Sequence, residues 1–339
     1  MKHRLAFVGF GVVGQGLGEI LAEKKNYLKE KYDFDYDVVG ICDMLKGSIV
    51  DEKGIELKDV LKKLKKNKKI SDEKVEPVKM IKNTSADIVI EATYTDLKTG
   101  EPAFTHLKTA LENKKHVVTT NKGPIALKYK ELKEIAEKNN VMLRFEGTVL
   151  SGTPSLALSM DALAGAEIIS VRGIVNGTTN YILTEMEKGR KYEDVLRKAQ
   201  ELGYAEADPK GDVEGWDAVG KAVILANTVM GGDLKINDVE RKGITKITLR
   251  QVEAARDRGK KIKLLAKVWK EKDKIRASVK PEELSFTDFL ANVSGVTNAL
   301  TFETDNLGSV TIIGPGAGGM ETGQALLGDM LAINRMVRA

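Results

Sequence analysis

An unusual concentration of acidic residues precedes a single lysine in residues 201–222, ELGYAEADPKGDVEGWDAVGKA. This segment has six carboxylates but only two lysines. Asp217 and Lys221 are spaced i and i+4, so on a helix they share one face. On an exposed helix they would form an ordinary ion pair, but the surrounding sequence, WDAVGKAVILA, is largely apolar. A partly desolvated lysine beside a carboxylate is suited to donate a proton to a carbonyl oxygen.

The remaining acids of this segment could bind a substrate that carries an ammonium group. Glu206 and Asp208 are available for that purpose. Asp212 is expected to be the N-cap of a helix over residues 213–230, because aspartate is a favoured N-cap residue.

A second motif, GIVNGTTNYILTEM (residues 173–186), predicts a strand, an Asn-Gly turn and a helix. Thr178 or Thr179 is expected to cap this helix. The exposed amides at such a helix start could bind a carboxylate.

A glycine-rich motif near the amino terminus points to a nucleotide. The six residues fit the pattern G-x-G-x-x-G between an apolar strand and a helix: Gly9, Phe10, Gly11, Val12, Val13 and Gly14. The first glycine permits a tight turn, the second lets a pyrophosphate approach the backbone, and the third lets the helix pack closely. In this strand–helix–strand setting the motif predicts a Rossmann-like dinucleotide site.

Asp43 ends the second predicted strand, YDVVGICD. A carboxylate at this point would accept a hydrogen bond from the ribose 2′-hydroxyl and repel a 2′-phosphate, which favours NAD. Lys46, three residues later, could instead pair with that phosphate, and Asp43 could also be an ordinary turn residue.

Two loops follow the later strands of this region. VTTNKGP places Lys122 after a strand, where the ligand crevice of an open α/β sheet lies, although a loop lysine is usually only solvated. FEGTVLSGTPSL combines Glu146 with hydroxyls and carbonyls in a glycine-broken turn. This loop could bind a monovalent cation or simply connect two domains.

The elements that position these residues divide into two groups. Up to about residue 150, short β-rich runs alternate with helical patterns, which predicts an α/β fold with a parallel, doubly wound sheet. Later, helices are followed by four β-like runs with short connections, which predicts an α+β domain. The last segment predicts a helix that docks back on the first domain. The expected domains are 1–145, completed by 317–339, and 146–316.

The composition excludes several classes of protein. A single cysteine, Cys42, rules out an internal disulfide and a cysteine-based zinc site. No apolar run is long enough to span a bilayer, and the apolar start predicts a strand rather than a signal peptide, so a cytoplasmic protein is expected. The net charge of +5 is modest, and KKLKKNKK (62–69) contains no aromatic residue. It predicts a solvated amphipathic helix rather than a nucleic-acid-binding surface.

Six motifs together resemble homoserine dehydrogenase: GFGVVGQG, TTNKGP, EGTVLSGTPS, GIVNGTTNYILTEM, residues 201–226 and GPGAGGMETGQALLGD. They follow the family's order and cover nearly the whole chain. The resemblance implies NAD(P)-dependent interconversion of L-homoserine and L-aspartate 4-semialdehyde in threonine, methionine and isoleucine biosynthesis. It also implies a homodimer assembled through the second domain.

The resemblance also implies roles for individual residues. Lys221, Asp217 and Lys122 would be catalytic, and Lys122 would lie between nicotinamide and substrate. Substrate contacts would come from Glu206, at the amino group, and from Asp212, Tyr204, Gly177 and Thr178. The cofactor would contact the glycine motif, Asp43, Thr93, Lys122 and Gly316. A sodium-type cation would be bound by Glu146 and by the carbonyls of Val149, Ser151 and Thr153.

The sequence departs from the family pattern in two places, which bear on regulation and on recognition of the adenosine side of the cofactor. The sequence stops after the catalytic region, so regulation by a carboxy-terminal domain is not expected, and residues 44–83 are unusually long and rich in lysine. A dehydrogenase for another amino-acid-like carbonyl and a dinucleotide-binding regulator without turnover are the alternatives. Lys221, Asp217 and Lys122 argue against the regulator, because a sensor needs no proton donor.

Overall fold

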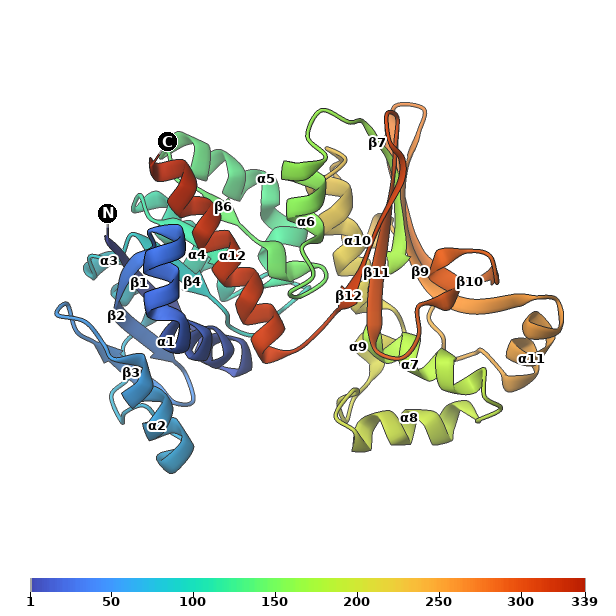
Figure 1. Ribbon diagram of the computed structural model, residues 1–339, viewed down its shortest axis with the longest axis horizontal. Helices are drawn as coiled ribbons and strands as arrows, with labels where there is room; N and C mark the ends of the chain where they lie inside the picture. Colours follow the sequence, from blue (N-terminus) through green and yellow to red (C-terminus); the bar gives the residue numbers. More distant parts are fainter. Residues whose placement is uncertain (1, 339) are drawn as a thin grey trace. The chain divides into compact units, whose positions relative to one another are not determined.

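The computed structural model describes residues 2–338. The chain divides into two units, one formed by Met1–Gly152 with Ala317–Ala339 and the other by Thr153–Gly316 (Figure 1). No helix within residues 2–338 combines the length and the apolar character needed to cross a membrane.

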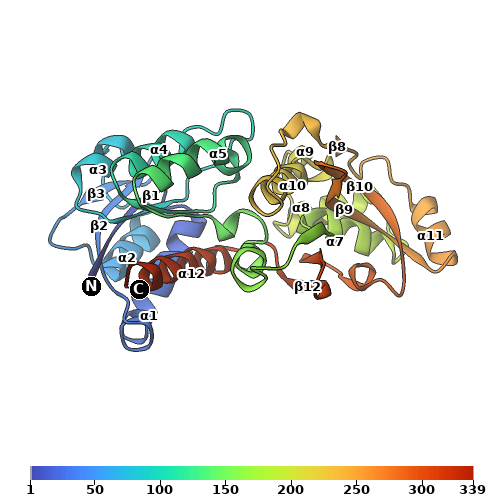
Figure 2. The same ribbon diagram turned by 90° about the horizontal axis from the view of Figure 1, so that it is seen from above.

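The first unit is built around a sheet whose strands are β1 (Lys2–Val8), β2 (Asp35–Asp43), β3 (Gly47–Val50), β4 (Ile88–Glu91), β5 (His116–Thr119) and β6 (Leu143–Arg144). Its helices are α1 (Val12–Tyr32), α2 (Leu57–Asn67), α3 (Pro77–Asn83), α4 (Ala103–Glu112), α5 (Lys122–Lys138) and α12 (Gly319–Arg338), with a short 3-10 turn, η1 (Glu146–Thr148). Helices α3, α4 and α5 cover one face of the sheet, and α1, α2 and α12 cover the other (Figure 2).

The strand order of this sheet is β3-β2-β1-β4-β5-β6. Its strands are parallel except for β3, which pairs antiparallel with β2 at the edge. The predicted α/β class is confirmed, and the long segment 44–83 is accounted for by β3, α2 and α3. Because β1 lies between β2 and β4, the order in which the chain adds strands to the sheet reverses there. At such a point, α/β sheets bind ligands at the carboxyl ends of their strands.

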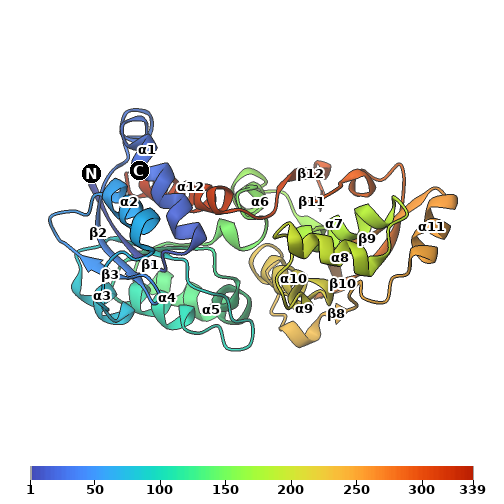
Figure 3. The same ribbon diagram turned by 90° about the horizontal axis from the view of Figure 1, so that it is seen from below.

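Helix α12 lies beside α1 although 286 or more residues separate them in sequence (Figures 1 and 3). Glycines permit this close approach: a Cβ on Gly16 would lie 2.2 Å from the carbonyl oxygen of Gly319, and one on Gly323 would lie 2.5 Å from the amide nitrogen of Leu17. Apolar side chains of α12, including Leu326 and Met330, join the core beneath α1. The C-terminal helix is therefore part of the nucleotide-binding unit.

The second unit contains a sheet formed by β7 (Ile168–Ile174), β8 (Glu240–Arg241), β9 (Lys260–Glu271), β10 (Lys274–Ser285), β11 (Thr297–Thr304) and β12 (Gly308–Pro315). Its helices are α6 (Ser155–Ala157), α7 (Gly177–Met186), α8 (Tyr192–Glu201), α9 (Lys210–Val213), α10 (Trp216–Thr228) and α11 (Leu249–Asp257). Short turns complete it: η2 (Leu158–Ala162), η3 (Ile236–Asp238) and η4 (Phe289–Asn292).

The strand order of this second sheet is β12-β11-β7-β9-β10-β8. Its long pairings are antiparallel, and α7 and α10 pack on β9. Helices α7 and α8 run side by side (Figure 3). The sequence predicted this succession of helices and β runs. In this α+β unit, α7 and α10 both pack on the sheet at β9.

Candidate active site

The glycine loop after β1 has the backbone that its sequence predicts. Gly9 has a φ of +91°, and a Cβ there would lie 2.5 Å from the carbonyl oxygen of Ala92. A Cβ on Gly14 would lie 2.7 Å from the carbonyl oxygen of Gly9, whereas one on Gly11 would meet nothing within 4 Å. The loop therefore needs glycine at two positions for packing, and at Gly11 it leaves open space at the start of α1. A phosphate fits this arrangement, because helix N-termini present amide donors.

Asp43 is tied to the backbone on both of its oxygens. Oδ2 accepts the Phe10 amide at 2.8 Å, and Oδ1 accepts the amides of Leu45 at 3.0 Å and Lys46 at 2.9 Å. The Lys46 ammonium lies 3.7 Å from Oδ2, and the Asp43 side chain is only 10% exposed. This carboxylate therefore holds the glycine loop against the turn after β2.

Residues at the carboxyl ends of β4 and β5 form a connected cluster in the same unit. Glu91 is fully buried and accepts the Thr93 amide at 3.1 Å, the Thr93 hydroxyl and the Thr119 hydroxyl at 3.0 Å. The side chain of Asn121 donates to the Thr93 carbonyl and caps α5 by accepting the Gly123 amide. Lys122 is the first residue of α5.

Glu91 was not identified as a site residue by the sequence reasoning. The sequence does indicate it, because Glu91 ends the apolar run DIVIE and a buried acid must be paired.

In the second unit, Lys221 and Asp217 form an ion pair on α10 in which Lys221 is buried and Asp217 is half-buried. The Lys221 ammonium lies 2.9 Å from Asp217 Oδ2 and donates to the Val175 carbonyl at 2.6 Å. Lys221 is only 7% exposed. The apolar residues around the pair predict that it is shielded from solvent, and the low exposure of Lys221 agrees with this.

Asn176 connects this pair to a second carboxylate. Its Nδ2 donates to Asp212 Oδ1 at 2.7 Å and to Asp217 Oδ2 at 3.0 Å. The Thr178 hydroxyl oxygen lies 2.6 Å from the Tyr204 carbonyl oxygen and 3.0 Å from Asp212 Oδ2, and its single hydrogen is shared between these two acceptors. Burial, followed by the charge of Asp217, raises the pKa of Asp212. The site is therefore a polar network between the start of α7 and the helices α9 and α10.

Two predicted helix caps are wrong. Asp212 lies inside the short helix α9, and Gly215, with a φ of +88°, precedes α10. A left-handed glycine there ends the first helix and starts a new one, which turns the Asp212 side chain toward α7. The cap of α7 is Asn176, whose Oδ1 accepts the Thr179 amide at 2.9 Å.

Asn176 was therefore missed as a site residue. The signal that could have found it is the strong N-cap preference of asparagine just before Gly-Thr-Thr.

The other predicted substrate and cofactor residues of this unit are more peripheral. Glu206 is exposed, and its carbonyl accepts from the side chain of Gln200. The Tyr204 ring packs edge-to-face on Tyr181, with ring centroids 5.1 Å apart. A Cβ on Gly177 would lie 2.7 Å from the Val296 carbonyl oxygen.

Gly316 ends the second unit. A Cβ there would lie 2.0 Å from Asn298 Oδ1, so any other residue would force the Asn298 side chain to move.

The predicted cation ligands of the first unit lie in one buried segment. Glu146, Val149 and Ser151 are all buried, and Ser151 has a φ of +55°. The Glu146 amide donates to Asp329 Oδ2 at 2.8 Å, which anchors the segment to α12. Burial raises the pKa of Asp329 to about 7.

Thr153 is the first residue of the second unit, and its hydroxyl donates to the Pro315 carbonyl at 2.9 Å. Within residues 2–338, no group of three or more His, Cys, Asp or Glu side chains could hold a metal ion. One carboxylate with backbone carbonyls is a set of hard oxygen ligands, which suits a cation of low charge rather than a transition metal.

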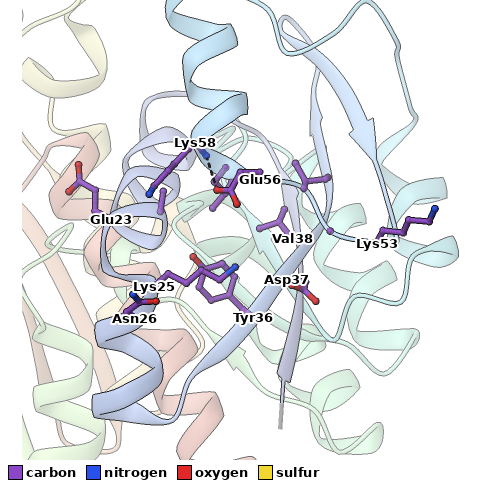
Figure 4. A pocket seen from close by; sticks show the side chains of 13 residues that line it. Glu23, Lys25, Asn26, Tyr36, Asp37, Val38, Lys53, Glu56 and Lys58 are labelled. Carbon is purple, nitrogen blue, oxygen red and sulfur yellow. Dashed lines mark hydrogen bonds between the residues drawn. The ribbon is translucent and has the colours of Figure 1, made fainter.

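A separate cavity of about 400 Å³ lies elsewhere in the first unit, between α1, β2 and the start of α2 (Figure 4). Its charged lining residues are Glu23, Lys25, Asp37, Lys53, Glu56 and Lys58. Glu56 accepts the Lys58 amide and thereby caps α2. Because this cavity borders the first half of β2, it is distinct from the glycine loop and Asp43 at the carboxyl ends of the strands.

A Rossmann-like unit with an intact glycine loop and a second unit with a buried lysine–carboxylate pair define an NAD(P)-dependent dehydrogenase. Two family models match the chain: "Homoserine dehydrogenase, NAD binding domain" over residues 9–146 and "Homoserine dehydrogenase" over residues 154–331. The chain therefore belongs to the homoserine dehydrogenase family, as the resemblance of its motifs predicts.

Similar proteins agree with this assignment. The homoserine dehydrogenase of Methanocaldococcus jannaschii is 43% identical over 97% of this chain and 98% of its own length. The NAD(+)-dependent homoserine dehydrogenase of Pseudomonas canavaninivorans is also 43% identical, over 98% of this chain and 97% of its own. A hyperthermophilic archaeal homoserine dehydrogenase, solved in complex with NADPH, has a TM-score of 0.86 at 31% identity and covers 99% of this chain and 98% of its own. This chain is an NAD(P)-dependent oxidoreductase of that family.

Proposed function

We propose that this enzyme interconverts L-homoserine and L-aspartate 4-semialdehyde, with Lys221 as the group that exchanges a proton with the substrate oxygen. The observation that carries this role is the burial of the Lys221 ammonium between Asp217 Oδ2 and the Val175 carbonyl. Two acceptors, at 2.9 and 2.6 Å, hold the ammonium in one position.

The need for a proton donor follows from the charge that develops on the substrate oxygen during reduction. NAD(P)H supplies a hydride to the aldehyde carbon when it is bound, so negative charge grows on the aldehyde oxygen. Lys221 stabilises this charge and donates a proton to give the alcohol of homoserine. In the oxidative direction the neutral lysine accepts the hydroxyl proton, and Asp217 keeps the amine oriented throughout.

The amino-acid part of the substrate requires separate contacts. We assign the substrate ammonium to the Glu206 carboxylate, with Asp212 and Tyr204 nearby, because an ionised acceptor binds an ammonium strongly. We assign the substrate carboxylate to the start of α7, at Gly177 and Thr178, because the first amides of a helix have no partner within the helix and can bind an anion. Lys122 and Thr93, at the carboxyl edge of the first sheet, are assigned to the nicotinamide side.

For the cofactor we propose that NAD serves at least as well as NADP. Asp43 places a carboxylate beside the glycine loop, where a 2′-phosphate would be repelled. The NAD(+)-dependent Pseudomonas relative supports this preference, whereas the archaeal relative solved with NADPH shows that the family also accommodates a 2′-phosphate.

We further propose that Glu146, with the carbonyls of Val149, Ser151 and Thr153, binds a monovalent cation such as sodium. A bound cation would stabilise this segment. The Asp329 hydrogen bond to the Glu146 amide already orders it from the α12 side.

The expected assembly is a homodimer in the cytoplasm. Apolar side chains exposed on the second sheet support this proposal, among them Ile169 on β7 and Ile313 on β12, since exposed apolar groups on a sheet favour protein contacts. Light scattering on the purified protein would measure the assembly, and a monomeric mass would contradict it.

A direct assay separates the proposed reaction from its alternatives. NADH or NADPH absorbance should fall on addition of aspartate semialdehyde and should rise when homoserine is added to NAD or NADP. Turnover with a different amino-acid-like carbonyl but not with the semialdehyde would indicate another substrate. Nucleotide binding without turnover would indicate a regulator.

A further inference from the structure

We propose that Asn176 is a positioning residue that holds Asp217, and through it Lys221, in the geometry needed for proton transfer. This inference rests on the proposed role of Lys221 as the proton donor. Asn176 lies between β7 and α7 and is only 6% exposed.

The orientation of the Asn176 amide is fixed by its contacts. Its Oδ1 accepts the Thr179 amide at 2.9 Å, so the NH₂ group must face the other way. The two hydrogens of this NH₂ group are then directed at Asp212 Oδ1, 2.7 Å away, and at Asp217 Oδ2, 3.0 Å away. One side chain thus caps a helix and bridges two carboxylates.

The contact to Asp217 reaches the proton donor directly. The oxygen that accepts from Asn176, Asp217 Oδ2, is the same oxygen that lies 2.9 Å from the Lys221 ammonium. The residue before Asn176 supplies the other contact, because the Val175 carbonyl accepts from Lys221. Residues 175 and 176 therefore hold both members of the ion pair.

Asn176 also separates two like charges. Asp212 and Asp217 converge on one nitrogen in a buried place, where repulsion is poorly screened. A donor between them stabilises both ionised forms. Without it, we expect the two carboxylates to move apart and Asp217 to shift relative to Lys221.

Two substitutions distinguish positioning from simple helix capping. Asn176→Asp keeps the shape and the acceptor for Thr179, and aspartate is as good an N-cap as asparagine, but it replaces the donor with a third carboxylate oxygen. Asn176→Ser also keeps a capping oxygen, yet its short hydroxyl has one hydrogen and cannot bridge both acids. A capping role predicts near-normal turnover for both variants.

The positioning role predicts that kcat falls about tenfold to a hundredfold in Asn176→Ser, and further in Asn176→Asp, since a small misplacement of a catalytic group can cost about a hundredfold. NADPH binding and the melting temperature should stay close to wild type in Asn176→Ser. Thr248→Asp, which places a carboxylate at the N-cap of α11 in the same unit, is the matched control and should leave kcat unchanged.

A double-mutant cycle with Asp217→Ala is the decisive measurement. If Asn176 acts through Asp217, adding Asn176→Ser to the Asp217→Ala variant should lower kcat little further. Additive losses in the cycle, or wild-type kcat in Asn176→Ser, would overturn the inference. If Lys221→Ala also turned over normally, the proposed function would fail as well. A dead Lys221→Ala beside a normal Asn176→Ser would reject only the role of Asn176.

Discussion

The buried histidine of β1 gives the first unit a pH-dependent stability that can be tested directly. His3 is 1% exposed; its Nδ1 lies 2.9 Å from Asp87 Oδ2, and its Nε2 lies 3.0 Å from Asn334 Oδ1. Asn334 donates its own NH₂ to the Tyr32 carbonyl, which fixes its oxygen toward His3. Two acceptors require two N–H donors, and only the imidazolium ion has both.

The direction of the pH dependence follows from these contacts. Burial alone would lower the pKa of His3, but the hydrogen bonds to Asp87 and Asn334 and the charge of Asp87 outweigh it, so the pKa is raised. A raised pKa means that protonation stabilises the folded state. This contribution is fully present below the unfolded value of about 6.5 and is lost as the pH rises through the folded pKa.

His3→Gln should therefore lower the free energy of unfolding most at acidic pH. A hydrogen bond to a charged group contributes about 1.5–3 kcal/mol. Asp87 is 37% exposed, so solvent screening weakens its share, and glutamine can replace one donor. We expect a loss of about 2 kcal/mol in the free energy of unfolding near pH 5.5. The loss should shrink in alkaline solution, where wild-type His3 is neutral.

Urea unfolding of wild type and variant between about pH 5 and about pH 9 measures this difference. His116→Gln is the matched control, because burial lowers the pKa of His116 and its Nδ1 accepts the Met142 amide. The contribution of His116 is thus present above about pH 6.5 and lost as the pH falls through its folded pKa. A difference between wild type and His3→Gln that stays constant with pH would refute the imidazolium assignment.

Two further predictions concern the ligands. Glu206→Gln keeps the side-chain shape but removes the charge that we assign to the substrate ammonium, so steady-state kinetics should show a raised KM for homoserine; a collapse of kcat at constant KM would assign Glu206 another role. Asp43→Ser removes three amide contacts and one negative charge, so kcat/KM should fall with both cofactors and the NAD/NADP ratio should move toward NADP. An unchanged ratio would contradict the role of Asp43 in cofactor choice.

The parts of the site that the sequence predicted are those set by local spacing. Asp217 and Lys221 are four residues apart on one helix, and apolar neighbours imply their burial, so the pair could be predicted without knowledge of the fold. The glycine loop could be predicted from its local pattern between a strand and a helix, although the atom that leaves no room for a Cβ at Gly9 is the carbonyl oxygen of the distant Ala92.

Partners that are distant in sequence could not be predicted in this way. Nothing in the local sequence pairs His3 with Asn334, 331 residues away, or joins Asp329 to the Glu146 amide. Most of the helix expected over 213–230 is present as α10, but its start was predicted wrongly, because the left-handed Gly215 separates α10 from α9. That break also turns Asp212 toward Asn176.

The role of Lys221 is the central claim, and its removal is the sharpest perturbation. Loss of a positioned general acid typically lowers the rate about a hundredfold to ten-thousandfold. Lys221→Arg should not restore it, because guanidinium holds its proton too tightly and has a different geometry. Lys133→Ala removes a comparable i,i+4 pair with Glu137 on the surface of α5 and is the control.

Single-turnover reduction of aspartate semialdehyde by Lys221→Ala, with NAD(P)H binding measured separately, tests this claim most directly. The expected result is a rate lowered by about a hundredfold or more, with cofactor affinity close to wild type because the glycine loop is intact. Lys133→Ala should react at the wild-type rate. A near wild-type rate in Lys221→Ala would contradict the assignment of this lysine as the proton donor.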